Sequence, residues 1–193
     1  MSFSHPIVNM FDKSRTFDCM GYWMESMVSA SIAQSMAKAF KYVEVSGAFT
    51  AGLLHDLGQL ALSEIAPKQT ARISKSLLGL ELVEAEEKIL GLAHTEAGFH
   101  LGVHWDLPTE IVETVRFHHS PVLASDGRRA LVSLVNVAEV VSRYHRPGNA
   151  SHELNFEECA ESLEFLDVSE PEVVEAIENP RDTIDSQSLW SKN

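Results

Sequence analysis

The sequence is poor in cysteine. Only Cys19 and Cys159 occur among the 193 residues, and no CxxC pair is present. A disulfide framework or a thiolate zinc site needs several cysteines at short, regular spacings. We therefore expect both residues to be free thiols in a reducing compartment.

Long apolar runs are also missing. No run of 18 apolar residues occurs, so the sequence offers no candidate for a membrane-spanning helix. Residues 1–6 do not form a basic stretch followed by an apolar one, which is the pattern of a secretory signal. These absences predict a cytoplasmic protein.

Basic residues are few. Lys and Arg number 15 against 28 acidic residues, which gives a formal net charge of −13. Much of the excess lies in residues 151–180, which hold 10 acidic residues and no Lys or Arg. Binding to nucleic acid or to an anionic membrane requires clustered cations that neutralise phosphates. We therefore expect neither partner, and we interpret the acidic segment as a solvated helix surface.

The alternation of apolar and polar residues that marks half-buried strands does not persist over any length. Helical spacing and capping residues instead predict an all-α fold, a compact orthogonal multi-helix bundle. We expect Gly58 to break one helix. We expect another helix to start at Pro67 and to end at Gly79. We expect a lead-in at 1–16, a helical domain at 17–150 and an acidic C-terminal helical extension at 151–193. The other expected helices cover residues 17–42, 47–54, 60–65, 84–90, 94–103, 110–119, 128–144, 156–166 and 170–178.

Motifs for phosphate-binding loops, serine-nucleophile elbows and HExxH zinc sites are absent. Instead, the adjacent pair His55-Asp56 stands at the end of an apolar helix, just before Gly58. Adjacent residues on a regular helix point about 100° apart, so both can face one ion only where the helix ends or distorts. Gly58 permits such a break, and the mixed nitrogen and oxygen donors suit Fe, Mn, Ni or Zn.

Other histidines also fall at expected helix ends. His94 opens one helix, and His118-His119 closes another. These helix ends can converge on one metal ion, but spacing alone favours the alternative that each histidine hydrogen-bonds a nearby carbonyl, because helix C-termini attract histidine. We interpret His100 and His104 as a surface pair, and we assign no role to the remaining histidines, which are His5, His145 and His152.

Taken in order, these motifs resemble the HDOD domain. That domain is a bacterial signalling module related to the HD phosphohydrolases and to the HD-GYP cyclic di-GMP phosphodiesterases. The resemblance covers about residues 17–145, and five motifs keep their order. They are Tyr22-Trp23-Met24-Glu25-Ser26, the run from Ala48 to Leu60 around His55-Asp56, Leu92-Ala93-His94-Thr95-Glu96-Ala97-Gly98, Trp105-Asp106-Leu107-Pro108, and His118-His119-Ser120-Pro121. Val137-Ala138-Glu139 resembles the helix that carries the last acidic residue.

The resemblance implies an HD-type bundle with a mono- or binuclear site for a divalent transition metal (Fe, Mn, Ni or Zn). It places Glu25 at the position of the first histidine of HD phosphohydrolases and Glu139 at that of the distal aspartate, with Asn136 as the other candidate for the distal position. Asp56 is also the implied catalytic residue. The implied metal ligands are His55, Asp56, His94, His118, His119, Glu25 and Glu139.

The chain departs from its relatives at several points. Gln59 replaces the lysine that follows the HD pair in HD-GYP proteins, and Ser120-Pro121 follows the histidine pair where those proteins carry GYP. The motifs of the usual N-terminal half of HDOD proteins are absent as well. We therefore do not expect cyclic di-GMP hydrolysis.

Three functions remain open at this point. The first is a non-catalytic signalling module that binds a protein partner or a small phosphate-containing ligand. The second is a metal-dependent phosphohydrolase of phosphate esters or nucleotides, in which Asp56 ligates the metal or orients a water as a base. In the third, the histidines are only structural hydrogen-bond partners. The sequence does not predict the oligomeric state.

Overall fold

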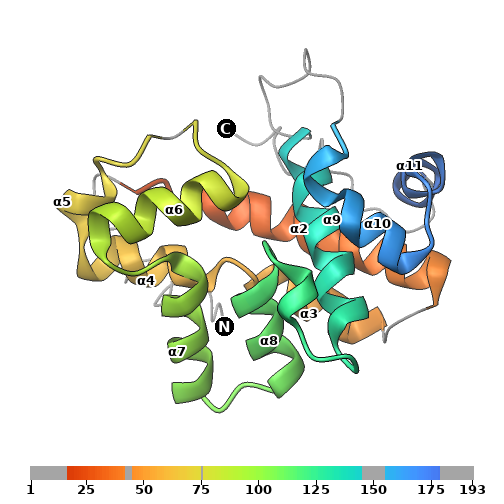
Figure 1. The fold of residues 1–193 in the computed structure, drawn as a ribbon, viewed down its shortest axis with the longest axis horizontal. Helices are drawn as coiled ribbons and strands as arrows, with labels where there is room; N and C mark the ends of the chain where they lie inside the picture. The colour runs from red at the N-terminus through yellow and green to blue at the C-terminus, as the bar shows by residue number, and fades with distance from the viewer. Residues whose placement is uncertain (1–16, 42–44, 75, 145–154, 179–193) are drawn as a thin grey trace, which may run out of the picture.

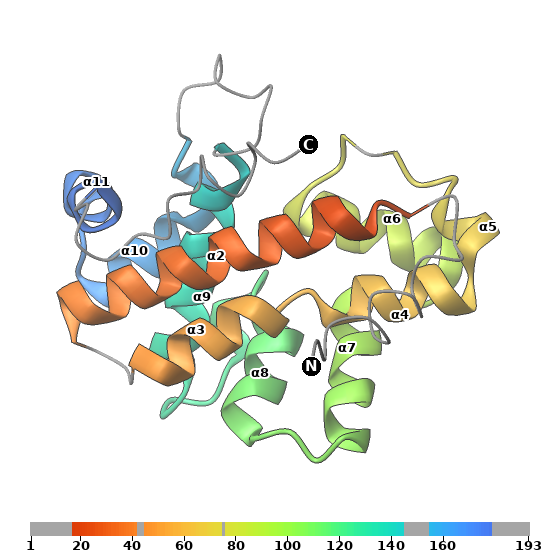
Figure 2. The ribbon, with the colours of Figure 1, turned by 180° about the vertical axis from the view of Figure 1, so that it is seen from behind.

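A computed structural model describes residues 17–41, 45–74, 76–144 and 155–178. These residues form helices joined by turns, and no strand occurs among them, which confirms the predicted all-α fold (Figure 1). The predicted lead-in 1–16 and residues 179–193 lie outside the described part. The helices run in several directions: α7 (His94–His104) and α8 (Thr109–Phe117) stand across the direction of α4 (Leu57–Ile65) in both views (Figures 1 and 2).

Two long helices organise the core. α2 (Cys19–Phe40) begins at Asp18, whose carboxylate accepts a hydrogen bond from the Gly21 backbone N–H at 2.9 Å. α9 (Arg129–Tyr144) packs against α2, and all its residues from 131 to 143 are buried. Helices α3 (Val45–Leu54) and α8 add further residues to the main apolar cluster. Because α9 is covered on every side, its polar residues are forced into buried contacts with neighbouring helices.

The apolar run around His55-Asp56 forms two helices. α3 (Val45–Leu54) ends just before this pair, and α4 begins just after it. The predicted interruption is therefore present, but the prediction that Gly58 causes it is wrong, because Gly58 lies inside the first turn of α4. Gly58 instead allows a close approach of α4 to α7, since an added Cβ would overlap the carbonyl oxygen of His94.

The second glycine prediction also needs correction. The helix that starts at Pro67 is the short α5 (Pro67–Thr70), and Gly79 begins α6 (Gly79–Leu90) instead of ending a helix. Its φ of 54° is in the left-handed region, which glycine adopts readily. α6 ends at Gly91 as predicted.

The described part of the acidic C-terminal segment, residues 155–178, packs on the core. The short η2 (Glu157–Cys159) and α10 (Ala160–Leu166) lie against α9, and α11 (Glu170–Glu178) lies against α2. At the start of α11, the N–H and the hydroxyl of Ser169 both donate to the Glu172 carboxylate, at 2.8 and 2.6 Å. The segment contributes Phe156, Cys159, Leu163, Leu166, Val168 and Val173 to the core.

The structure bears on the predictions about disulfides and membrane-spanning helices. Neither Cys19 nor Cys159 takes part in a disulfide, and burial raises the pKa of the Cys159 thiol to about 12. Within the described ranges, no helix combines the length and the apolar character that crossing a bilayer requires.

Candidate metal centre

The interruption between α3 and α4 places His55 and Asp56 inside the molecule, with exposed fractions of 1% and 8%. Three other helices bring side chains to the same place: the start of α7 supplies His94, the residues after α8 supply the histidine pair, and the middle of α9 supplies Glu139. Figure 2 shows the start of α7 and the end of α8 beside the α3–α4 connection. Distant parts of the chain thus form one cluster.

One group of donors consists of Asp56, His94, His118 and His119, with one donor atom of each within 4.8 Å of the others. Nε2 of His94 lies 3.3 Å from Oδ1 of Asp56, and Nε2 of His118 lies 3.6 Å from the same oxygen. Nε2 of His94 is also 3.4 Å from Nε2 of His118 and 3.2 Å from Nε2 of His119. These atoms surround a common point.

A second group consists of His55, Asp56 and Glu139, again with donor atoms within 4.8 Å of one another. Nε2 of His55 is 3.6 Å from Oδ2 of Asp56. Asp56 therefore belongs to both groups and could contribute an oxygen to a cation in either.

The outer nitrogens of His55 and His118 fix the direction of their rings. Nδ1 of His55 is 2.8 Å from the Gly52 carbonyl oxygen, and Nδ1 of His118 is 3.0 Å from that of Val115. A carbonyl only accepts, so each Nδ1 carries the hydrogen in these bonds. Each Nε2 then has a lone pair directed into the cluster, as a metal ligand requires.

His94 is fixed by a carboxylate that sequence analysis missed. Glu86 on α6 is 4% exposed and accepts hydrogen bonds from the Nδ1–H and the backbone N–H of His94, at 2.6 and 2.8 Å. A carboxylate behind a ligating histidine is the usual support of metal sites, because it orients the ring and raises its basicity. The available signal was an acidic residue in line with Leu82 and Leu90, four positions away on each side, on the apolar side of an amphipathic helix.

Gln59 supports Asp56. Its side-chain amide donates to Oδ2 of Asp56 at 2.8 Å, from one turn further along α4. The residue that stands in place of a lysine thus helps to orient a predicted ligand. Asp56 occupies the position before α4 but does not cap the helix with its side chain, because its carboxylate faces Gln59 and the histidines.

The structure distinguishes between the two candidates for the distal position. Oδ1 of Asn136 accepts a hydrogen bond from the Ser162 hydroxyl of α10 at 2.7 Å. Glu139, one turn further along α9, has Oε2 at 3.4 Å from Nδ1 of His119. The geometry therefore places Glu139, and not Asn136, within the cluster.

The charges of the cluster follow from its contacts. Burial raises the pKa of the Asp56 carboxyl, but the imidazoles of His55, His118 and His94 outweigh burial and hold this pKa well below its usual range. Burial likewise raises the pKa of Glu139, which His119 and Arg143 lower below its usual range. Both carboxylates are therefore ionised at neutral pH.

The histidines respond in opposite directions. Burial lowers the pKa of His94, but the Glu86 and Asp56 carboxylates outweigh it and raise this pKa above that of an ordinary histidine. Burial holds the pKa of His119 well below its usual range. Without a metal, a proton on His94 therefore supplies positive charge that the two carboxylates attract.

A metal ion fits this cluster for a further reason. Three buried atoms, Nε2 of His55, Oδ1 of Asp56 and Oε2 of Glu139, have no hydrogen-bond partner. Buried polar atoms without partners are costly, and these three belong to the residues of the second donor group and each offers a lone pair. A divalent cation coordinated by them would compensate this cost, and imidazole with carboxylate suits transition metals.

Not every predicted ligand joins the cluster. Glu25, half-buried on α2, belongs to neither donor group, so its role as a ligand stays a prediction. His100 and His104 lie on the exposed side of α7, and His100 is 3.4 Å from a Glu96 carboxylate oxygen. Their interpretation as surface residues agrees with this placement.

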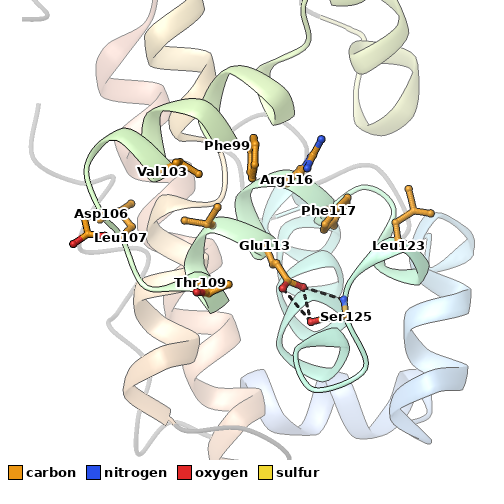
Figure 3. Close-up of a pocket in the computed structure, with 11 residues that line it drawn as sticks. Phe99, Val103, Asp106, Leu107, Thr109, Glu113, Arg116, Phe117, Leu123 and Ser125 are labelled. Atoms are coloured by element: carbon orange, nitrogen blue, oxygen red, sulfur yellow. Dashed lines mark hydrogen bonds between the residues drawn. The ribbon is translucent and has the colours of Figure 1, made fainter.

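A separate groove of about 530 Å³ lies along α7, α8 and η1 (Pro121–Leu123) (Figure 3). Apolar side chains such as Phe99 and Phe117 line it, and the Arg116 guanidinium lies 4.1 Å from the Phe99 ring centre while it donates to Glu96. None of the residues lining this groove belongs to the two donor groups. The groove is therefore distinct from the candidate metal centre.

Comparison with known proteins agrees with the resemblance found in the sequence. The family profile described as the HDOD domain matches residues 2–121. A curated protein of Treponema pallidum (strain Nichols), described as uncharacterized, is 25% identical over 132 residues. That match covers 63% of this chain and 24% of the relative, so this chain spans about a quarter of the relative's length.

Solved structures share the fold. A putative phosphohydrolase from Shewanella amazonensis SB2B aligns with a TM-score of 0.67 and 20% identity, over 95% of this chain and 66% of that one. The MmoQ response regulator from Methylococcus capsulatus str. Bath aligns with a TM-score of 0.61 and 20% identity, over 84% of this chain and 62% of that one. An HDOD domain protein with unknown function from Geobacter sulfurreducens aligns with a TM-score of 0.58 and 22% identity, over 95% of this chain and 61% of that one.

Proposed function

Because this chain belongs to the HDOD domain family, we propose that it is a bacterial signalling module built around a divalent-metal centre. The observation that carries the proposal is the set of three buried, unpartnered donor atoms on His55, Asp56 and Glu139. Histidines that serve only as structural hydrogen-bond partners would not leave these atoms unpaired. The response-regulator relative of the same fold supports a signalling role.

The residues that would hold the metal are those of the two donor groups. His94, His118 and His119 would bind with Asp56 at one position, and His55 and Glu139 with Asp56 at the other. This arrangement accommodates one ion or two. Fe, Mn, Ni and Zn all accept such mixed nitrogen and oxygen donors.

The signalling role is favoured over catalysis by what surrounds the centre. Gln59 carries no positive charge, and its amide is already bound to Asp56. Arg143 touches Glu139 but is also held by Glu158, so two carboxylates already neutralise it. Binding of a substrate phosphate needs a cation that is free to pair with it. We expect the module to act through a protein partner or a bound phosphate-containing ligand.

The second candidate is a metal-dependent phosphohydrolase, and the putative phosphohydrolase of similar fold favours it. A bound metal would lower the pKa of a coordinated water and stabilise charge on phosphoryl oxygens. In this chain, Asp56 would orient that water through its carboxylate, while Gln59 holds Oδ2 in place. The ring of His94, fixed by Glu86, would keep its Nε2 directed at the same point.

Elemental analysis of the full chain, purified without a histidine tag, tests the proposal. We expect a transition metal in wild type and a large loss in Asp56→Ala, with no loss in His100→Ala, which removes an exposed histidine outside both donor groups. Less than about a tenth of an ion per chain, with melting unchanged by chelator, would contradict the proposal.

A screen of phosphate esters and nucleotides with the metal-loaded chain separates the two candidates. Metal binding without turnover supports the signalling module. Turnover that Asp56→Ala abolishes supports the phosphohydrolase.

A further inference from the structure

A continuous set of ion pairs connects the C-terminal acidic segment with the candidate metal centre. The buried Arg143 of α9 donates to Oε1 of Glu139 at 2.5 Å and to Oε2 of Glu158 in η2 at 2.6 Å. The other oxygen of Glu139, Oε2, faces the cluster at 3.4 Å from Nδ1 of His119. One guanidinium thus links a predicted metal ligand to a side chain that is 47% exposed.

We propose that Glu158, acting through Arg143, positions the Glu139 carboxylate and offsets the repulsion that the Arg143 guanidinium would exert on a cation in the metal centre. This inference rests on the proposed metal-binding function. Glu158 and Arg143 are positioning residues in this account, because neither belongs to a donor group.

Glu158 offsets the positive charge that Arg143 places beside Glu139. With both carboxylates present, the guanidinium pairs with two negative charges, so its net repulsion of a cation at Glu139 is reduced. Without Glu158, Arg143 would pair with Glu139 alone and its charge would not be offset. Charge interactions in a buried site are weakly screened, so Arg143 would oppose a cation at Glu139 more strongly.

Gly79 lies beside this ion pair. A Cβ added to Gly79, the first residue of α6, would lie 3.4 Å from Oε2 of Glu158 and 3.9 Å from Nη2 of Arg143. The start of α6, the end of α9 and η2 therefore meet at this ion pair. This ion pair is connected with the metal centre in two ways. Arg143 donates to Glu139, and α6, which starts beside the pair, carries the Glu86 that fixes His94.

The chain offers a matched control for this pair. Glu161, three residues after Glu158, pairs with Arg129 of the same helix α9 at 3.0 Å. Glu158→Gln and Glu161→Gln each remove one negative charge and break one ion pair between α9 and the C-terminal segment. Only Glu158 is connected with Glu139 through its arginine, so the net-charge effect is common to both variants and the positioning effect is not.

Titration of the untagged full chain with Co²⁺, followed by its visible absorption, tests the inference. Supports behind metal ligands change affinity by about 10–100-fold, and Glu158 acts one residue further away, so we expect Glu158→Gln to bind Co²⁺ about three- to tenfold more weakly than wild type. Glu161→Gln should stay within about twofold of wild type, and Glu158→Asp should recover part of the loss.

Equal affinities of wild type and Glu158→Gln, or an equal loss in both Gln variants, would overturn the inference. A second readout works without metal: the ring ¹⁵N resonances of His119, whose Nδ1 faces Glu139. We expect them to shift in Glu158→Gln and not in Glu161→Gln. If wild type binds no Co²⁺, the proposed function fails, and the His119 resonances alone test the positioning role of Glu158. A shift confined to Glu158→Gln supports that role. Unchanged resonances overturn it.

Discussion

Nδ1 of His94 lies 2.6 Å from Oε2 of Glu86, and both side chains are buried. The same oxygen accepts the His94 backbone N–H, so one carboxylate holds both the ring and the first residue of α7. A histidine held in this way keeps its Nε2 directed into the cluster whether or not a cation is bound. The relationship therefore indicates a preorganised ligand.

Replacing this carboxylate should weaken metal binding. Glu86→Gln removes the charge but keeps the shape, and we expect Co²⁺ affinity to fall by about 10–100-fold while the circular dichroism spectrum stays helical. Glu87→Gln, at the exposed neighbouring position of α6, is the control and should match wild type. An unaltered affinity in Glu86→Gln would show that His94 is not a ligand.

The Gln59 amide should matter for the same reason. Gln59→Leu removes the donor that holds Oδ2 of Asp56 at 2.8 Å and leaves the carboxylate free to rotate. We expect about tenfold weaker Co²⁺ binding, measured by competition with a chelator. Gln69→Leu, at an exposed position of α5, should leave the affinity unchanged. Equal behaviour of the two variants would mean that Asp56 needs no support from Gln59.

Gly58 should be sensitive to the smallest substitution. In Gly58→Ala the new methyl group meets the His94 carbonyl, so α4 and α7 must move apart, and we expect a loss of about 3 kcal/mol in the free energy of unfolding. Gly127→Ala, where no atom lies within 4 Å of the added Cβ, should change this free energy by less than about 0.5 kcal/mol. Urea unfolding measures both, and similar values would contradict the close approach of the two helices.

Metal affinity should increase with pH. Burial lowers the pKa of His94, but Glu86 and Asp56 raise it above its ordinary value, so the metal-free fold holds a proton that a metal must displace. That proton stabilises the metal-free fold below about pH 6.5, and its contribution is lost as the pH rises through the raised pKa of His94. We expect Co²⁺ affinity to fall by about tenfold per pH unit below this pKa.

The variant without the Glu86 charge provides the check on this pH dependence. Because Glu86 raises the pKa of His94, Glu86→Gln should move the pH dependence of Co²⁺ binding to lower pH. A midpoint that does not move between wild type and Glu86→Gln would assign the competing proton to another group.

The sequence was sufficient for the parts of the centre that depend on local pattern. His55-Asp56 stands at a helix end, and His94 and His118-His119 stand at others. Spacing alone favoured separate hydrogen bonds for these histidines, and the order of motifs, through the resemblance, implied one cluster. The structure brings the implied residues together except Glu25. The end of α6 at Gly91 followed from glycine chemistry alone.

The parts that were missed depend on tertiary packing. Glu86 was not recognised because its burial depends on how α6 lies against the start of α7, which no local pattern encodes. Gly58 was interpreted as a helix break because a close helix contact and a break favour the same residue. The Glu158–Arg143–Glu139 connection required the position of η2 on α9, and Glu25 was placed by motif order alone.

The central claim is that one cation, or two, is bound among these side chains. Anomalous diffraction from crystals of the untagged chain, recorded at the absorption edge of the metal found by elemental analysis, tests it most directly. The account predicts a peak about 2.0–2.3 Å from Nε2 of His94 and of His118 and from Oδ1 of Asp56. A metal-supplied crystal with no peak there, or a peak bound only by surface residues such as His100, would contradict it.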